Sequence, residues 1–367
     1  MLRKPPPSEP PPITDIETLR DKLQDAIQLE FTTIPAYLSG WYSVKNRRDD
    51  KFQDFAEAIQ WIVVTEMRHM SIACNILIAF GGTPEIAKRA PVYPCAIPDM
   101  DQSGLVHLMG YGSDFVKLGL FIEKPASPPP CLKVRGGVDR NRLPGGIPRL
   151  VDPYPSIGAF YSALITALDG GIPNIEQYLD PQSLPRQYIR FGGQDYIGVD
   201  SVKQAVALMH DIIDEGEGSD NQDGHYDLFD ENGDLSHFYS FAALKNEQGY
   251  TPGDDPCKPS GPALTRLPKP GDVVNIPSDP MMCKYTDYPD AWKAADAFNQ
   301  FYARIVDDLD TGFKSHPHQI DSAIGRMHQL EALADKVLAQ KLAGDTFAAP
   351  TFELKPYRTE PPQLPKR

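Results

Sequence analysis

Glu66 and His69 stand three residues apart, a spacing that places both side chains on one face of a helix. The residues on that face are otherwise apolar and follow steps of three and four, as Ile59, Ile62, Ala73 and Ile76 show. An ionised carboxylate on such a buried face costs on the order of several kcal/mol unless a partner neutralises it. A divalent metal ion is such a partner, and Glu-x-x-His is a pair with which helix bundles hold two metal ions.

Glu30 shows the same anomaly on an earlier predicted helix, where it stands between Ile27 and Ile34 on the apolar face. A helix with a lone glutamate followed by a helix with Glu-x-x-His matches half of a two-metal site. The alternative is a metal-free buried ion pair, in which Arg68 or His69 is the partner of a glutamate.

The second half of such a site is less clear from the residues. The segment 214–218 contains Glu215 and Glu217, either of which could be a ligand, and a solvated acidic helix end is the alternative. His237 stands among aromatic residues at the start of a predicted helix, where an imidazole satisfied in the core is the alternative. Tyr37 follows the first glutamate and would line a pocket or pack in the core.

Apolar periodicity and capping residues predict a mainly α protein built as a helix bundle. We expect Pro35 to kink or interrupt the first helix, and strand signals are few, for example at 273–276. The predicted helices are Ile16–Val44, Asp50–Phe80, Leu105–Ile122, Ser156–Leu168, Val199–Gly216, Leu235–Lys245, Asp290–Phe313 and Ile320–Leu342.

The 37 prolines divide the chain into parts. Residues 1–15 are expected to form a mobile proline-rich arm. Residues 16–249 would form the metal-binding bundle, with long proline-rich loops. Residues 250–289 would be a connecting loop rich in proline and glycine, and residues 290–367 a C-terminal helical pair that packs on the bundle.

The composition excludes several classes of partner. Fifty acidic residues against 36 basic ones give a formal net charge of −14, which repels nucleic acid and anionic membrane surfaces. No apolar run is expected to span a bilayer. The five cysteines are scattered without a Cys-x-x-Cys pair, which argues against a disulfide framework and a structural zinc site and favours a reducing, cytoplasmic location.

Several segments together resemble the ferritin-like domain of the iminophenyl-pyruvate dimer synthase family, whose multidomain members act in bis-indole pathways. The resemblance covers about residues 19–244. It is carried by the segments Leu29–Leu38, Glu66–His69, Asn75–Pro84, Tyr93–Pro94, Ile122–Pro125, Ile157–Tyr161, Ile213–Gly218 and His237–Phe241.

The resemblance implies a metal site made by Glu30, Glu66, His69, Glu217 and His237. Glu217 is preferred over Glu215 because the family tolerates glutamine at the earlier position. Glu123 is the candidate for the remaining carboxylate, since a ferritin-like bundle expects a lone glutamate on its third helix; a surface glutamate at a helix end is the alternative. The family commonly has glutamate where this chain has Ala159, which leaves one metal ion or an asymmetric pair open.

The function that follows is a metal-dependent oxidase or oxygenase of the non-haem di-iron type, acting with O2 on a small, amino-acid-derived substrate in secondary metabolism. One iron, or another divalent metal, is the alternative to two irons. A non-catalytic iron-binding protein and a metal-free scaffold remain open, as does a homo-oligomer. Zinc hydrolysis is disfavoured because His-Glu-x-x-His is absent and the predicted site is rich in oxygen ligands.

Overall fold

The computed structural model describes residues 10–100, 105–133, 154–218, 220–221 and 225–360, and it is mainly α-helical as predicted. Its strands are short and form two separate antiparallel pairs, β1 (Arg190–Phe191) with β2 (Asp195–Tyr196) and β3 (Asp220–Asn221) with β4 (His225–Tyr226). The helices are α1 (Ile16–Ser43), α2 (Gln53–Ala79), α3 (Ser113–Ile122), α4 (Ile157–Thr166), α5 (Val202–Gly216), α6 (His237–Asn246), α7 (Pro289–Lys314) and α8 (His318–Leu338).

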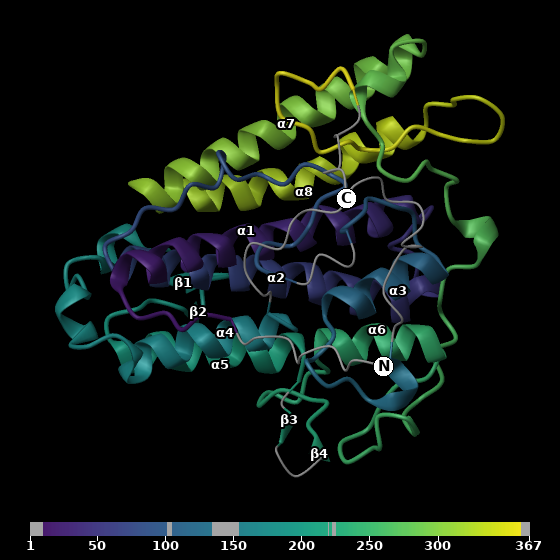
Figure 1. The fold of residues 1–367 in the computed structure, drawn as a ribbon. Coiled ribbons are helices and arrows are strands. Elements are labelled where there is room, and N and C mark those ends of the chain that lie inside the picture. The colour runs from purple at the N-terminus through teal and green to yellow at the C-terminus, as the bar shows by residue number, and fades with distance from the viewer. Residues whose placement is uncertain (1–9, 101–104, 134–153, 219, 222–224, 361–367) are drawn as a thin grey trace, which may run out of the picture.

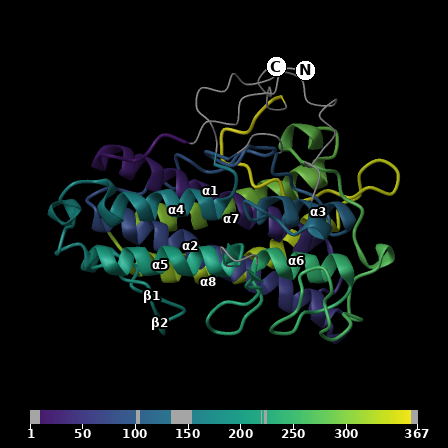
Figure 2. The same ribbon diagram turned by 60° about the horizontal axis from the view of Figure 1, so that its bottom comes forward.

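The bundle combines two long helices with two rods that are each made of two shorter helices. α1 and α2 pack against each other along their length. Both views place α4 and α5 beside one half of this pair and α3 and α6 beside the other half (Figures 1 and 2). One rod therefore consists of α3 and α4, and the other of α5 and α6, with a break in each rod partway along the bundle.

α1 continues across Pro35 as a single helix, so the expected interruption is absent. Each of the two preceding threonines returns a hydrogen bond to a carbonyl in the turn before it: Thr32 to Gln28 at 2.7 Å and Thr33 to Glu30 at 2.7 Å. Packing on all sides also holds this stretch, which is buried from Leu29 to Tyr37.

Other boundaries differ from the prediction for local reasons. α3 begins at Ser113 rather than Leu105, because two glycines, Gly110 and Gly112, precede it and the segment before them pairs through Val106 with Cys95. The strand expected at 273–276 is reduced to a single bridge between Val273 and Val44.

The C-terminal pair α7 and α8 packs on the α1 side of the bundle (Figure 1). Arg47, which follows α1 and is only 5% exposed, joins the two parts. Its guanidinium group contacts Glu331 and Asp335 of α8, each at 2.8 Å. These contacts hold α8 in this position on the bundle, because the buried charge of Arg47 would otherwise be unpaired.

The helical segment Asp50–Ala79, which includes α2, is long and apolar enough to cross a membrane by length and composition, which corrects the expectation that no segment is. However, 83% of its most apolar window is buried inside the protein. A core helix of a bundle has this property, since it is covered by neighbouring helices on most sides.

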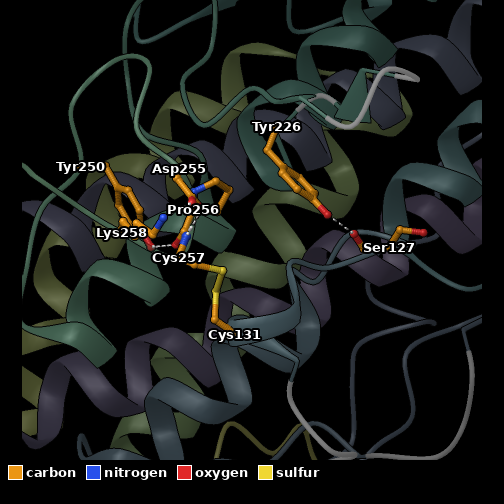
Figure 3. The surroundings of a disulfide bond; sticks show 8 residues. All are labelled: Ser127, Cys131, Tyr226, Tyr250, Asp255, Pro256, Cys257 and Lys258. Atoms are coloured by element: carbon orange, nitrogen blue, oxygen red, sulfur yellow. Dashed lines mark hydrogen bonds and ion pairs between the residues drawn. A yellow bond between two sulfur atoms is a disulfide. The ribbon is translucent and has the colours of Figure 1, made fainter.

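Cys131 and Cys257 form a disulfide, a pairing that the scattered cysteines did not predict (Figure 3). Both cysteines are exposed. Cys131 lies in the segment after α3, and Cys257 lies in a loop after α6 in which the Tyr250 hydroxyl donates to the Pro256 carbonyl at 2.9 Å. The disulfide thus ties together the segments that follow two neighbouring helices.

Candidate metal centre

Five of the six predicted ligands gather, together with Glu215, where the two composite rods are broken. Glu123 is the C-cap of α3, and Glu215 lies in the last turn of α5. His237 is the first residue of α6. Opposite them, the continuous helices α1 and α2 supply Glu30, Glu66 and His69. The break therefore brings helix ends and their side chains into the middle of the bundle.

These side chains are almost completely buried: Glu30, Glu66, His69 and Glu123 are each 2% exposed, and His237 is 0% exposed. Glu123 is therefore not a surface residue, although it lies at a helix end. Such burial of carboxylates requires compensating charge or hydrogen bonds.

One half of the centre is built around His69. Its Nδ1 lies 3.7 Å from Oε2 of Glu30, and its Nε2 lies 2.8 Å from Oε2 of Glu215. Glu215 also contacts Nη1 of Arg68 at 3.2 Å. Glu215 is thus placed between an imidazole and a guanidinium group and fixes the orientation of the His69 ring.

The other half is built around His237. Its Nδ1 lies 2.8 Å from Oε1 of Glu66 and 3.7 Å from Oε2 of Glu123. The His69 and His237 rings face each other with centroids 5.5 Å apart. Glu66 is close to both halves, because ligand atoms of Glu66, His69 and His237 all lie within 4.8 Å of one another.

The electrostatics of the metal-free centre follow from this crowding. Burial and the charge of Glu30 raise the pKa of Glu66, and burial and the charge of Glu66 raise the pKa of Glu123. Burial alone would lower the pKa of the imidazoles, but the neighbouring carboxylates raise the pKa of His69 to about 10 and that of His237 to about 9. The carboxylate cluster therefore favours positive charge at its centre.

The chemistry of these groups fits a bound metal ion. One ligand atom from each of Glu66, His69 and His237 can be chosen so that all lie within 4.8 Å of one another. Within the described part of the chain, Nδ1 of His237 lies 2.8 Å from Glu66 without the alignment of a hydrogen bond, and Nε2 has no hydrogen-bond partner. Glu30, Glu66 and Glu123 also supply oxygen ligands beside the two imidazoles.

Glu217, which the sequence-based reasoning prefers over Glu215, makes its hydrogen bonds at the start of α4 and not to either histidine, although, besides burial, the charge of Glu123 is near enough to raise its pKa. Its carboxylate accepts hydrogen bonds from the Gly158 amide at 2.6 Å and the Ser156 hydroxyl at 3.1 Å. These groups form the N-terminus of α4, which attracts negative charge. Burial nevertheless raises the pKa of Glu217 to about 8.

Sequence reasoning missed three hydroxyl groups that contact the carboxylates. Tyr161 donates to Glu30 and Tyr37 donates to Glu123, and the Thr33 hydroxyl, which also contacts the Glu30 carbonyl, lies 2.6 Å from Oε2 of Glu66. Tyr161 lies in the segment Ile157–Tyr161, which supported only the resemblance to the family, and Tyr37 was expected to line a pocket or pack in the core. Polar donors at helical spacing from a predicted ligand were the available signal: Thr33 and Tyr37 follow Glu30 by three and seven residues on α1.

Comparison with known proteins agrees with this architecture. A family model described as Ferritin-like matches residues 23–246, more than half of the chain, and the protein therefore belongs to the ferritin-like family. A solved structure described as a ferritin-like protein from Caulobacter vibrioides is similar with a TM-score of 0.56 and 21% sequence identity, over 88% of this chain and 98% of that one. No curated protein matches the sequence.

Proposed function

We propose that this protein is a metal-dependent oxidase or oxygenase of the non-haem di-iron type. The observation that carries the proposal is the convergence of Glu30, Glu66 and Glu123 on two buried imidazoles, one of which is close to a carboxylate but makes no well-aligned hydrogen bond in the described structure. Membership of the ferritin-like family supports it, because glutamates and histidines in such bundles hold pairs of metal ions.

Each half would hold one ion, and Glu66 would lie between the two ions. Glu30 and His69 would hold one, and Glu123 and His237 the other. Iron suits this mixture of oxygen and nitrogen ligands, and its two oxidation states would supply the electrons for reaction with O2. One iron, or another divalent metal, is the alternative that a metal analysis distinguishes.

Glu215 would act on the metal through His69. Because Nε2 of His69 is engaged by Glu215 at 2.8 Å, Nδ1 is the nitrogen that remains free for a metal ion, and it is the one that faces Glu30. A carboxylate that holds the outer nitrogen of a histidine ligand fixes its orientation and increases its basicity. We therefore propose Glu215 as an orienting residue and do not retain Glu217 as a ligand.

The proposed substrate is a small, amino-acid-derived molecule of secondary metabolism, as the resemblance to iminophenyl-pyruvate dimer synthases suggests. A cavity of about 20 Å³ is bordered by Ile122, which precedes Glu123 in the chain, and by Ser156, which donates a hydrogen bond to Glu217. This volume holds about one water molecule and is too small for such a substrate.

A homo-oligomer and a cytoplasmic location also remain proposals. The Cys131–Cys257 disulfide weighs against the cytoplasm, because disulfides persist mainly in oxidising compartments.

Metal analysis tests the proposal. Protein purified without chelator should contain close to two metal ions per chain, or take up two Fe(II) under anaerobic conditions and develop a charge-transfer band on exposure to O2. Glu66→Ala and His69→Ala should abolish loading while the protein stays helical by circular dichroism. Full metal content in both variants would show that the centre lies elsewhere.

A non-catalytic or metal-free role is favoured by one observation: the His69–Glu215 and His237–Glu66 contacts of 2.8 Å pair each imidazole with a carboxylate without a metal. In that case, anaerobic Fe(II) titration would show no binding. Binding of iron without any spectral change in O2 would instead indicate an iron-binding protein that performs no oxidation.

A further inference from the structure

Glu30 and Glu123 have matching surroundings in the two halves of the centre. The Tyr161 hydroxyl donates to Oε1 of Glu30 at 2.6 Å, whereas Oε2 of the same carboxylate lies 3.7 Å from His69. One oxygen is therefore held by a phenol, and only the other faces an imidazole.

Glu123 repeats this division. The Tyr37 hydroxyl donates to its Oε1, and its Oε2 lies 3.7 Å from His237. The two tyrosines come from different helices, Tyr37 from α1 and Tyr161 from α4. The same arrangement is thus built twice from unrelated parts of the chain.

Both tyrosine hydroxyls are held beside these carboxylates because their side chains are buried: Tyr37 is 1% exposed and Tyr161 is 0% exposed. A buried hydroxyl that loses its acceptor bears the full cost of desolvation. If Glu30 or Glu123 turned its phenol-bound oxygen toward a metal ion, the tyrosine hydroxyl would lose its acceptor and the protein would bear that desolvation cost. A carboxylate can bind a metal through one oxygen or through both, and here the second mode is opposed.

We propose that Tyr37 and Tyr161 are positioning residues that restrict Glu123 and Glu30 to one metal-binding oxygen each. This restriction keeps a coordination position of each metal ion free for a small exogenous ligand such as O2 or an anion. The inference rests on the proposed function, because it requires that the centre bind metal.

The experiment uses Co(II) as the metal and azide as the exogenous ligand, with the full-length protein. Wild type, Tyr37→Phe and Tyr161→Phe are loaded with Co(II), their stoichiometry is measured, and azide is titrated while the visible Co(II) bands are recorded. Each Phe variant frees a carboxylate oxygen to chelate. We expect unchanged Co(II) stoichiometry, weaker visible bands and about a tenfold loss of azide affinity, the lower end of what changes to partners of metal ligands cost in metal affinity or activity.

Tyr93→Phe is the matched control. Tyr93 is also buried, but its hydroxyl donates to the backbone carbonyl of Thr32 on α1 at 2.7 Å instead of to a carboxylate. This variant loses a buried phenol hydrogen bond of the same kind and should bind azide as wild type does. A general loss of packing would affect all three variants.

The outcomes separate the two proposals. Wild type that binds no Co(II) would overturn the metal centre and this inference with it. Wild type that binds Co(II), with Phe variants of unchanged spectrum and azide affinity, would overturn only the positioning role. Tyr37 and Tyr161 belong to different halves, so if one variant fails to fold, the other still decides.

Discussion

Gly158 leaves the space that the Glu217 carboxylate occupies: a Cβ atom at position 158 would lie 2.6 Å from Oε2 of Glu217. The same glycine donates its amide to Oε1 of Glu217 at 2.6 Å. The start of α4 and the end of α5 are thus joined by a carboxylate that fits only against a residue without a side chain.

Gly158→Ala is expected to lower the free energy of unfolding by about 1–3 kcal/mol, because the methyl group displaces a buried, hydrogen-bonded carboxylate. Gly325→Ala is the control, since Gly325 lies exposed in α8 with no atom within 4 Å of its Cβ position. It should raise stability by about 0.5–1 kcal/mol. Urea unfolding of both variants measures the two effects, and equal signs would contradict the argument.

Exchanging each of two glutamates for glutamine distinguishes their roles. Glu215→Gln is expected to weaken metal binding by about 10–100-fold, because it removes the charge that orients His69 and pairs with Arg68. Glu217→Gln should leave the affinity unchanged, since its partners are Gly158 and Ser156. Calorimetric titration of apo protein with Co(II) gives both constants. The reverse ranking would restore Glu217 as the ligand.

Asp25 on α1 gives the protein a pH-dependent stability term. Burial and the nearby Asp99 raise its pKa from the ordinary value of 3.8 to about 6. Between these values the native state keeps a proton that the unfolded state releases, so stability is lost as the pH rises from about 4 to about 6.

Asp25→Asn removes this titration. The fall in unfolding free energy between pH 5 and pH 7.5 should therefore be about 1 kcal/mol smaller in the variant than in wild type. Urea unfolding at the two pH values measures the difference. Parallel profiles for the two proteins would mean that Asp25 ionises normally in the fold.

The Cys131–Cys257 disulfide should stabilise the fold by restricting the unfolded chain, because it joins residues 126 positions apart. The double variant Cys131→Ser, Cys257→Ser is expected to lose about 2–4 kcal/mol of unfolding free energy. Cys283→Ser is the control, since this partly exposed cysteine is free. Wild type whose denaturation midpoint is unaffected by a dithiol reductant would contradict the expectation.

Helical periodicity was sufficient to predict most of the fold and the burial of the candidate ligands on α1 and α2. Glu30, Glu66 and His69 stand on apolar faces of long helices, where the sequence alone shows that a polar residue is buried. The ferritin-like architecture is confirmed by the family match. These features depend on local spacing, which a sequence displays directly.

The remaining features depend on contacts between distant segments. Glu215 and Glu217 are two positions apart at a helix end, so they point about 200° from each other around the axis. Which one faces His69 depends on where α4 begins, and the sequence does not show this. The disulfide is similar, since its connectivity cannot be deduced from the spacing of five cysteines.

The interrupted rods have a consequence for how this protein can change in evolution. α1 and α2 pass the centre without a break, so helix geometry alone keeps Glu30, Glu66 and His69 in register. At the same level α3 ends at Ile122 and α5 at Gly216, and the chain resumes in α4 at Ile157 and in α6 at His237. Insertions there lengthen a loop without shifting either long helix. The surroundings of the centre can therefore vary through these connections, while the residues on the continuous helices remain as they are.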